Sequence, residues 1–431
     1  MDFSIVIARM ACSLRMLYVD LLRTMTKTNK FVVISEEFPP RSGGVARFSF
    51  DICKQLDVQG RLVQAISLER TPIEQAGFPF CHLPLATRTN CNGDSFWPFR
   101  KINSALFRVQ QECEYRFSNT LLCHLDQLRV DHGQFTVWLT YTVHHPNLVR
   151  RVLQKGGFEY WLLFHGLDLI DGERACQPVG QWVKKAERIV FNSQATQRLY
   201  GELGFERNAN ESVCYPGVDA TAALASIEKE PDCIFDKLPT QCRETFIISS
   251  VCRLVRRKGL DLAIQGVAEL LRTNQDCYFV IAGDGPELQS LKSLVHSMGL
   301  EQRVLFPGQV SDAEKFSLLH HSDLFLMPNR CLGGRDFEGF GISFVEAAVA
   351  GTCTIGGKHG GACEAIADQT TGFLAETDDA AEAVEKIRLL VADLYRNPSK
   401  RIALGQAGKQ LALEKFDTSK VIEHLLRETF A

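Results

Sequence analysis

Residues 245–259, TFIISSVCRLVRRKG, join a continuous apolar run to a cluster of cations and then to a glycine. An unbroken run of aliphatic and aromatic residues is typical of a strand that is buried on both faces of a parallel sheet. The cations stand where this strand should end, and helical periodicity begins at Gly259 and continues to about residue 273. The segment therefore predicts a strand, a positively charged turn and a helix.

The same alternation continues towards the C-terminus. The predicted strands are 277–283, 303–308, 323–328 and 352–357, and the predicted helices are 285–298, 311–320, 341–350 and 361–367. From about Asp378 onward the pattern is helical throughout. Strands that alternate with helices indicate a doubly wound parallel sheet, in which ligands bind at the carboxyl ends of the strands.

The first half of the chain carries a second series of the same type. Its predicted strands are 31–36, 62–68, 135–141, 159–166 and 188–193, and its predicted helices lie at about 45–58 and from Ser193 onward. No G-x-G-x-x-G fingerprint of a dinucleotide site follows a strand, which disfavours a dehydrogenase. Because single cores rarely exceed about 250–300 residues, two domains also suit the length of 431 residues. We predict an α/β protein with two Rossmann-like, doubly wound parallel-sheet domains.

The predicted domain boundaries follow these two series. We expect an N-terminal extension at 1–30, a first domain at 31–216, a linker at 217–243, a second domain at 244–415 and a final helix at 416–431. The extension is apolar but interrupted by charges. We interpret it as non-native or peripheral, with Met25 as the functional start, and a helix on a membrane surface is the alternative.

Charge and composition exclude several kinds of partner. The 48 basic and 51 acidic side chains give a formal net charge of -3, so no overall field attracts nucleic acid. The 15 cysteines include no Cys-x-x-Cys pair, and the adjacent pairs His144–His145 and His320–His321 lack further ligands at zinc spacing, so no metal is expected. No run approaches the roughly 20 apolar residues of a membrane span. We expect a cytoplasmic protein.

One predicted helix, at about 99–117, leaves peripheral contact with the inner face of a membrane open. The residues of its apolar face are Ile102, Leu106, Val109, Cys113 and Phe117. Basic residues lie on its other faces, as in helices that rest on anionic lipid. Packing of the apolar face against the protein core is the alternative that we favour.

The cations at the end of the 245–251 strand predict an anion site. Arg253 and Lys258 stand between a strand end and a helix N-terminus. A guanidinium, an ammonium and the helix dipole all favour phosphate oxygens, so a diphosphate is the expected ligand. The alternative is a solvated basic turn without a ligand.

A second motif, 338-EGFGISFVEA, places two carboxylates around a glycine-rich helix start. Gly339 and Gly341 lack side chains, so the backbone N–H groups of residues 340–343 can approach an anion. Glu338 and Glu346 repel phosphate and are better suited to accept hydrogen bonds from the hydroxyl groups of a sugar or a ribose. The alternative is that one carboxylate caps the helix and the other lies on its surface.

Several motifs, taken together and in this order, resemble glycosyltransferase family 4, the retaining nucleotide-sugar transferases of the GT-B fold. They are 38-FPPRSGGVAR, 165-HGLD, 192-NSQAT, 215-YPGVD, 252-CRLVRRKG, 283-GDGPE, the pair Glu338 and Glu346, and 360-GGACE. The resemblance covers most of the chain from residue 31 onward. It implies two domains that face each other across a cleft, and a final helix at 416–431 that packs back on the first domain.

The resemblance also implies roles for individual residues. Arg253 and Lys258 would neutralise the donor diphosphate, Glu346 would hold the ribose hydroxyls and Glu338 would contact the transferred sugar. The remaining residues expected to bind the donor are Gly43, Gly44, Gly283, Gly285, Phe340, Gly341 and Ile342. Cys252, where the family often has glycine, and the long 329–341 loop leave the identity of the donor open.

His165 is the last residue expected to act in catalysis. It ends the predicted strand 160-YWLLF, so its imidazole should project from the carboxyl edge of the first sheet and hydrogen-bond a sugar hydroxyl. A structural histidine is the alternative.

The resemblance implies a retaining transfer of a hexose from a nucleotide-diphosphate sugar to a glycan, a lipid-linked or a small-molecule acceptor, without a metal or other cofactor. Cell-surface polysaccharide or glycoconjugate synthesis is the expected setting. The alternatives are a GT-B nucleotide-sugar epimerase and a non-catalytic relative that binds sugar nucleotide.

Overall fold

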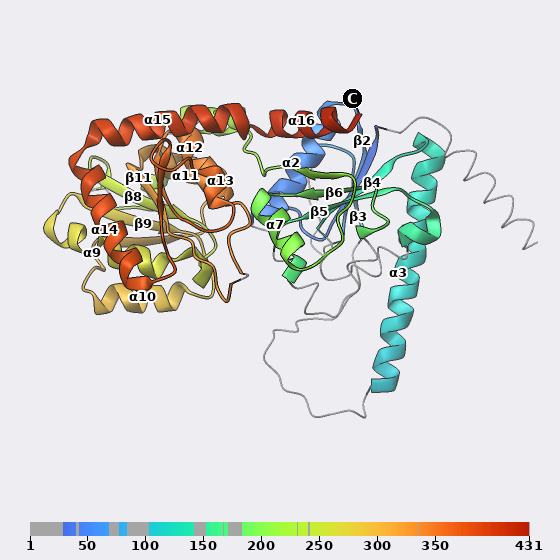
Figure 1. Ribbon diagram of the computed structural model, residues 1–431, viewed down its shortest axis with the longest axis horizontal. Coiled ribbons are helices and arrows are strands. Elements are labelled where there is room, and N and C mark those ends of the chain that lie inside the picture. Colours follow the sequence, from blue (N-terminus) through green and yellow to red (C-terminus); the bar gives the residue numbers. More distant parts are fainter. Residues whose placement is uncertain are drawn as a thin grey trace, which may run out of the picture. The chain divides into compact units, whose positions relative to one another are not determined.

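The computed structural model describes residues 29–39, 43–68, 77–83, 103–141, 152–166, 168–170, 183–230, 232–239, 242–334 and 336–430, without the side chains of 103–115 and 141. These residues contain two parallel sheets with helices packed around them (Figure 1). The chain divides into two compact units, and the larger unit takes in the described residues of 42–52, 164–180 and 190–431. The predicted fold class is confirmed.

The first sheet has the strand order β3-β2-β1-β4-β5-β6-β7. Its strands are β1 (Phe31–Ser35), β2 (Leu62–Ser67), β3 (Phe80–His82), β4 (Thr136–Tyr141), β5 (Tyr160–Phe164), β6 (Arg188–Phe191) and β7 (Glu211–Val213). The five strands predicted from apolar runs are confirmed. The sequence does not predict β3 and β7, because three residues are too few to show a periodicity.

The helices α2 (Gly44–Val58), α3 (Asn103–His132) and α7 (Gln194–Glu202) accompany the first sheet, and residues 152–156 and 168–170 are helical as well. α7 begins where the sequence predicts, because the Ser193 side chain accepts a hydrogen bond from Thr196 N and caps it. α3 runs well past the predicted end at residue 117. The side chains expected to form its membrane face lie outside the described residues except for Phe117, so that hypothesis stays a prediction.

The second sheet has the order β10-β9-β8-β11-β12-β13. Its strands are β8 (Phe246–Val251), β9 (Cys277–Ala282), β10 (Val304–Gly308), β11 (Leu324–Met327), β12 (Cys353–Gly357) and β13 (Gly372–Ala375). The helices that follow them are α9 (Leu260–Thr273), α10 (Leu288–Ser297), α11 (Asp312–His321), α12 (Ile342–Ala350), α13 (Ala362–Ala365), α14 (Ala380–Arg396), α15 (Pro398–Lys415) and α16 (Thr418–Phe430). Only β13, a short edge strand, is not predicted.

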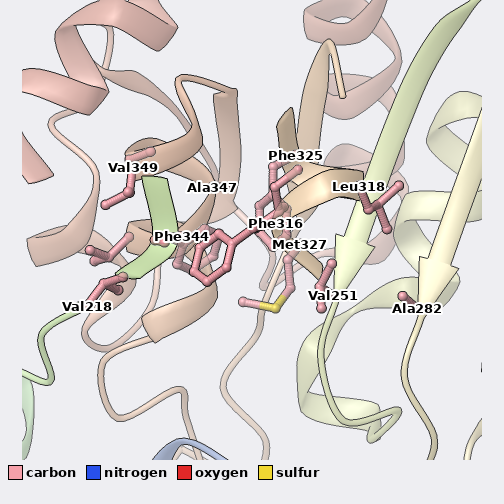
Figure 2. Close-up of a cluster of buried hydrophobic side chains, with 14 of the residues drawn as sticks. Val218, Val251, Ala282, Phe316, Leu318, Phe325, Met327, Phe344, Ala347 and Val349 are labelled. Atoms are coloured by element: carbon pink, nitrogen blue, oxygen red, sulfur yellow. The ribbon is translucent and has the colours of Figure 1, made fainter. Parts of the chain in front are cut away.

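Alternate residues of the central strands enter two different hydrophobic clusters. Val280 of β9 joins one cluster, whereas Phe279 and Ile281 join the other. Successive side chains of a strand point to opposite faces, so this sheet is buried on both sides. Figure 2 shows the first cluster, in which Phe344 of α12 lies edge-to-face with Phe325 of β11, at 5.7 Å between ring centroids.

The connector between the two series is more ordered than the sequence predicts. Helix α8 (Ala220–Lys229) and a 3-10 turn at Cys233–Asp236 occupy much of 217–243. Asp219 caps α8 by accepting a hydrogen bond from Ala222 N, and Ala223 packs into the core of the second sheet. Val218, two residues before α8, also pairs with the segment before α16, since Val218 N donates to Phe416 O over 2.9 Å.

Two expectations concern the ends of the chain and the membrane. The packing of α16 against the first domain stays a prediction. The interpretation of residues 1–28 stays one as well, because they lie outside the described residues. In the part of the chain that the structure describes, no helix is long and apolar enough to cross a membrane.

We predict that Gly283→Ala destabilises the fold much more than Gly299→Ala. Both glycines have positive φ, but an added Cβ at Gly283 would lie 2.0 Å from Cys252 O, whereas at Gly299 nothing lies within 4 Å. The alanine at 283 should cost about 2–4 kcal/mol and the alanine at 299 about 1 kcal/mol, because only the first adds overpacking to backbone strain. Urea unfolding of both variants checks this, and equal losses would contradict it.

Candidate active site

The cationic turn after β8 is a short 3-10 helix, η3 (Arg256–Lys258), that leads into α9. Gly259 closes the turn with φ +69, and a Cβ there would lie 2.0 Å from Pro328 O. Only glycine combines this conformation with so close a backbone contact. The turn buries the Lys258 side chain, which is 9% exposed.

Glu338 pairs with two of these cations. Lys258 Nζ lies 2.8 Å from Glu338 Oε2, and Arg257 Nε lies 3.4 Å from the same oxygen. Burial raises the pKa of the Glu338 carboxyl, but the charges of Lys258 and Arg257 outweigh burial and lower it to about 2. Glu338 is therefore an ionised, buried hydrogen-bond acceptor throughout the physiological pH range.

Arg253, the other cation expected to bind phosphate, lies in a different environment. Its side chain is exposed, and its guanidinium makes no hydrogen bond or ion pair with the described residues. The two cations that the sequence groups as one anion site thus differ: Lys258 is already matched to Glu338, while Arg253 is available to an added ligand. The interpretation of 253–259 as a solvated basic turn fits Arg253 but not the buried Lys258.

The glycine-rich start of α12 brings two predicted segments together. An added Cβ at Gly339 would lie 2.3 Å from His165 O, so the segment after Glu338 packs directly on the end of β5. Gly341 has φ +87, and a Cβ there would meet the Phe344 ring at 2.7 Å. Ile342 begins the helix.

The side chain of Phe340, a residue expected to bind the donor, lies in the hydrophobic core. Its side chain is 2% exposed and packs against Tyr215 and Phe416, with ring centroids at 5.2 and 5.4 Å. The ring belongs to the core, so any contact of this residue with a donor would use its backbone.

His165 directly follows β5 and is half-buried, with its ring edge-to-face with Phe48 at 6.1 Å between centroids. Asp168 holds the turn beneath it: the carboxylate accepts hydrogen bonds from the backbone N–H groups of His165, Gly166 and Leu169. The motif 165-HGLD contains Asp168, but the sequence argument gives it no role. Asp168 orders the backbone that carries the histidine.

Glu346, in the middle of α12, is 8% exposed and has its own cation. Lys315 of α11 donates to Glu346 Oε1 over 2.6 Å and to Asp312 Oδ1 over 2.9 Å. Asp312 Oδ2 in turn accepts a hydrogen bond from Arg47 at 2.9 Å. The sequence argument gives no role to Lys315 of α11 or to Arg47 of α2, although Arg47 ends the motif 38-FPPRSGGVAR.

These groups line part of a small pocket of about 40 Å³ in the larger unit. Its lining residues include Arg47, Asp312, Lys315, Ile342 and Glu346, and residues around the start of α8 form much of the rest of the wall. Both Glu346 and Ile342, in the first turn of α12, line this pocket. These are the two parts of the 338–347 motif that we expect to contact a nucleotide.

The predicted glycines fall into two groups. Gly43 has φ +145 with open space around it, and a Cβ at Gly44 would make an ordinary 3.6 Å contact with Ile342. Gly283 and Gly285 instead accommodate the backbone of residues 252–254, since a Cβ at Gly285 would lie 2.4 Å from Leu254 O. Close packing alone accounts for the second group, so its contact with a donor stays a prediction.

Glu364, the last residue of 360-GGACE, caps another helix. Its carboxylate accepts hydrogen bonds from Gln194 N and Ala195 N, both at 2.8 Å, in the first turn of α7. A carboxylate is favourable at this end of the helix dipole. The motif therefore ties α13 to α7 within the larger unit and gives a structural reason for its glutamate.

The family model described as glycosyl transferases group 1 matches residues 237–411. The GDP-mannose-dependent alpha-(1-6)-phosphatidylinositol monomannoside mannosyltransferase of Mycobacterium tuberculosis (strain CDC 1551 / Oshkosh) is 36% identical over 305 residues, 68% of this chain and 74% of that enzyme. The chain belongs to the group 1 glycosyl transferases. It is thus an enzyme of the glycosyltransferase class.

Two further matches define the extent of the similarity. An enzyme of the same name from Mycolicibacterium smegmatis is 35% identical over 173 residues, and the match spans 39% of this chain and 44% of that enzyme. In three dimensions this glycosyltransferase resembles Anabaena HepE, solved in complex with UDP-glucose, with a TM-score of 0.68 and 17% identity over 93% of this chain and 99% of that one. The structural likeness establishes the GT-B fold.

We predict that Lys258→Met destabilises this glycosyltransferase strongly, whereas Arg253→Met does not. Losing one partner of a buried ion pair costs about 3–5 kcal/mol, and the loss at 258 should be at the lower end because Arg257 still faces Glu338. The exposed Arg253 should contribute within about 0.5 kcal/mol. Urea unfolding at pH 7 measures both.

The same pair gives the loss a pH dependence. The folded pKa of Glu338 is lowered to about 2, so its stabilisation is present above its unfolded pKa, near 4.5, and is lost as the pH falls towards 2. The stability difference between the wild type and Lys258→Met should therefore shrink between pH 5 and pH 3. A difference independent of pH would show that the Lys258 side chain stabilises only by packing.

Proposed function

We propose that this glycosyltransferase is a retaining member of family 4 that transfers a hexose from a nucleotide-diphosphate sugar. The observation that carries the proposal is the Lys258–Glu338 pair, which holds a buried, ionised carboxylate beside the N-terminus of α12 and after the cationic exit of β8. A diphosphate needs cations and backbone N–H groups, and a sugar needs hydrogen-bond acceptors. The two requirements meet within one short stretch of structure.

The proposed donor contacts follow from these environments. Arg253 and the first amides of α12 bind the diphosphate, and Lys258 adds to the positive field there. Glu338 accepts hydrogen bonds from the transferred sugar, and Glu346 accepts them from the ribose. Gly43 and Gly44, at the start of α2, allow the backbone to approach the donor phosphates closely, since Gly43 has open space around it.

In the proposed reaction the acceptor hydroxyl attacks the face that the leaving group vacates, and a donor phosphate oxygen takes its proton. Arg253 and the helix amides stabilise the charge that develops on the departing diphosphate. His165 hydrogen-bonds a hydroxyl of the transferred sugar. No residue of the chain has to form a covalent bond, and we expect the enzyme to work without a metal.

An epimerase of the same fold is the nearest alternative, and the electrostatics of Glu338 argue against this residue as its acid or base. Such chemistry needs a carboxyl group that can give and take a proton near neutral pH. A carboxyl with a pKa of about 2 stays ionised and is a weak base. Glu338 is thus better suited to hold a sugar than to exchange protons with it.

The names of the relatives suggest which substrates to test first. Both mycobacterial relatives are named as GDP-mannose-dependent enzymes that act on phosphatidylinositol monomannoside. We therefore propose mannose transfer from GDP-mannose to a glycan or lipid-linked acceptor in glycoconjugate synthesis. We place the enzyme in the cytoplasm, with peripheral contact to the membrane that carries the acceptor.

We predict that one of GDP, UDP and ADP, most simply GDP, raises the melting temperature, because a ligand that binds only the folded state stabilises it by mass action. At a concentration 100 times its Kd, the gain should be about 2.7 kcal/mol. Arg253→Ala should reduce this shift while leaving the melting temperature of the free protein unchanged. A panel in which no nucleotide shifts the wild type would contradict a sugar-nucleotide enzyme.

We predict that the product keeps the anomeric configuration of the donor sugar and that turnover persists in excess EDTA. NMR of the product anomer tests the first point, and an assay with and without EDTA and manganese tests the second. An inverted linkage, or activity that EDTA abolishes and manganese restores, would defeat the proposed mechanism.

We predict that His165→Ala lowers kcat at least about tenfold with little change in stability, since a lost hydrogen bond to the reacting sugar weakens the transition state. Phe48→Leu serves as a matched control, because it removes the ring that packs on the imidazole but leaves the imidazole in place. Wild-type turnover by His165→Ala would return the histidine to a structural role. Absence of any turnover by the wild type, despite nucleotide binding, would favour the non-catalytic alternative.

A further inference from the structure

Lys315 is a buried cation that the proposed function leaves without a role. Its side chain is 15% exposed, and the Glu346 side chain that it contacts is 11% exposed. Burial lowers the pKa of Lys315, but Glu346 and Asp312 outweigh burial and raise it. The ammonium therefore stays charged, and it is held between two carboxylates, one on its own helix and one on α12.

The contact fixes one oxygen of Glu346 and leaves the other to a ligand. Oε1 accepts the hydrogen bond from Lys315, whereas Oε2 makes no hydrogen bond with the described residues. A carboxylate offers about four lone-pair positions, so one fixed oxygen still leaves room for two donors. The 2′- and 3′-hydroxyls of a ribose are two adjacent O–H donors of this kind.

The rest of the ion chain limits how far Lys315 can move. Asp312 binds Lys315 through Oδ1 and Arg47 through Oδ2, and the Arg47 guanidinium also contacts Asp51 at 3.0 Å. Positive and negative groups thus alternate from Asp51 to Glu346. A lysine ammonium on its own is a mobile point charge, but neighbours on both sides restrict it to one position.

We propose that Lys315 is a positioning residue that holds the Glu346 carboxylate ready to accept hydrogen bonds from the ribose hydroxyls of the donor nucleotide. This inference rests on the proposed function and deepens it. An acceptor that is already oriented loses less conformational freedom when the ligand binds. Lys315 then contributes to the recognition of the ribose without a required contact to the nucleotide.

The test compares nucleotides that differ only at the ribose. Isothermal titration measures the Kd of GDP, UDP and ADP and of their 2′,3′-dideoxy forms for the wild type and for Lys315→Met. For the nucleotide that binds, the variant should lose about tenfold or more in affinity for the ribose form and little for the dideoxy form. The preference of the wild type for the ribose form should therefore collapse.

Two matched variants complete the design. Lys315→Arg keeps the charge and should restore most of the preference. Lys237→Met removes a lysine outside the pocket that pairs with Glu314 of α11, the helix that carries Lys315, at 2.8 Å. This variant should leave both affinities unchanged. If Lys315→Met does not fold, Lys315→Gln replaces it, with the same expected direction.

The outcomes separate this inference from the proposed function. An equal loss of affinity for the ribose and dideoxy forms would overturn the inference, because it would make Lys315 a structural or general electrostatic group. An unchanged preference in Lys315→Met would overturn it as well. If the wild type binds none of the three nucleotides, it is the proposed function that fails.

Discussion

The burial of the Glu338 carboxylate is the constraint on which the site depends. An ion of this kind costs several kcal/mol to remove from water unless cations and hydrogen bonds compensate. The exit of β8 supplies those cations, and it can do so only because η3 turns sharply at Gly259, whose missing Cβ allows the backbone of Pro328 to approach. The strand exit, the glycine and the ion pair are therefore a single unit. Changing any one of them alters the other two.

The same packing logic extends to the neighbouring strand exits. Gly283 and Gly285 let the turn after β9 pack against the backbone that leads to Lys258, and Gly339 lets the Glu338 segment pack against His165. Glycines that look like ligand contacts in the sequence thus bring backbone segments close together. They position charged groups indirectly, because a bulkier residue would separate the elements that carry those groups.

Much of this could be predicted from the sequence, because long buried strands and helix periods are local signals. The edge strands β3, β7 and β13 could not. β3 and β7 have three residues each, too few to show a periodicity, and β13 begins with a glycine and adds only three further apolar residues. The sequence also could not predict that Lys258 is buried in an ion pair while Arg253 is exposed. That difference depends on Glu338, which lies 80 positions after Lys258 in the chain. Lys315 is the clearest case: nothing near it in the sequence shows that it meets Glu346.

The two buried glutamates illustrate why residue type alone does not define a site. Glu338 begins the 338–347 motif and Glu346 lies near its end, and each forms an ion pair with a lysine at under 3 Å. Glu338 faces two cations from a turn whose backbone is fixed, whereas Glu346 faces one lysine that is shared with Asp312. A carboxylate whose negative charge is balanced by a nearby lysine can stay ionised in a buried position. It can then accept hydrogen bonds from hydroxyl groups. Recognition of an uncharged sugar and ribose therefore depends on cations that need not touch either of them.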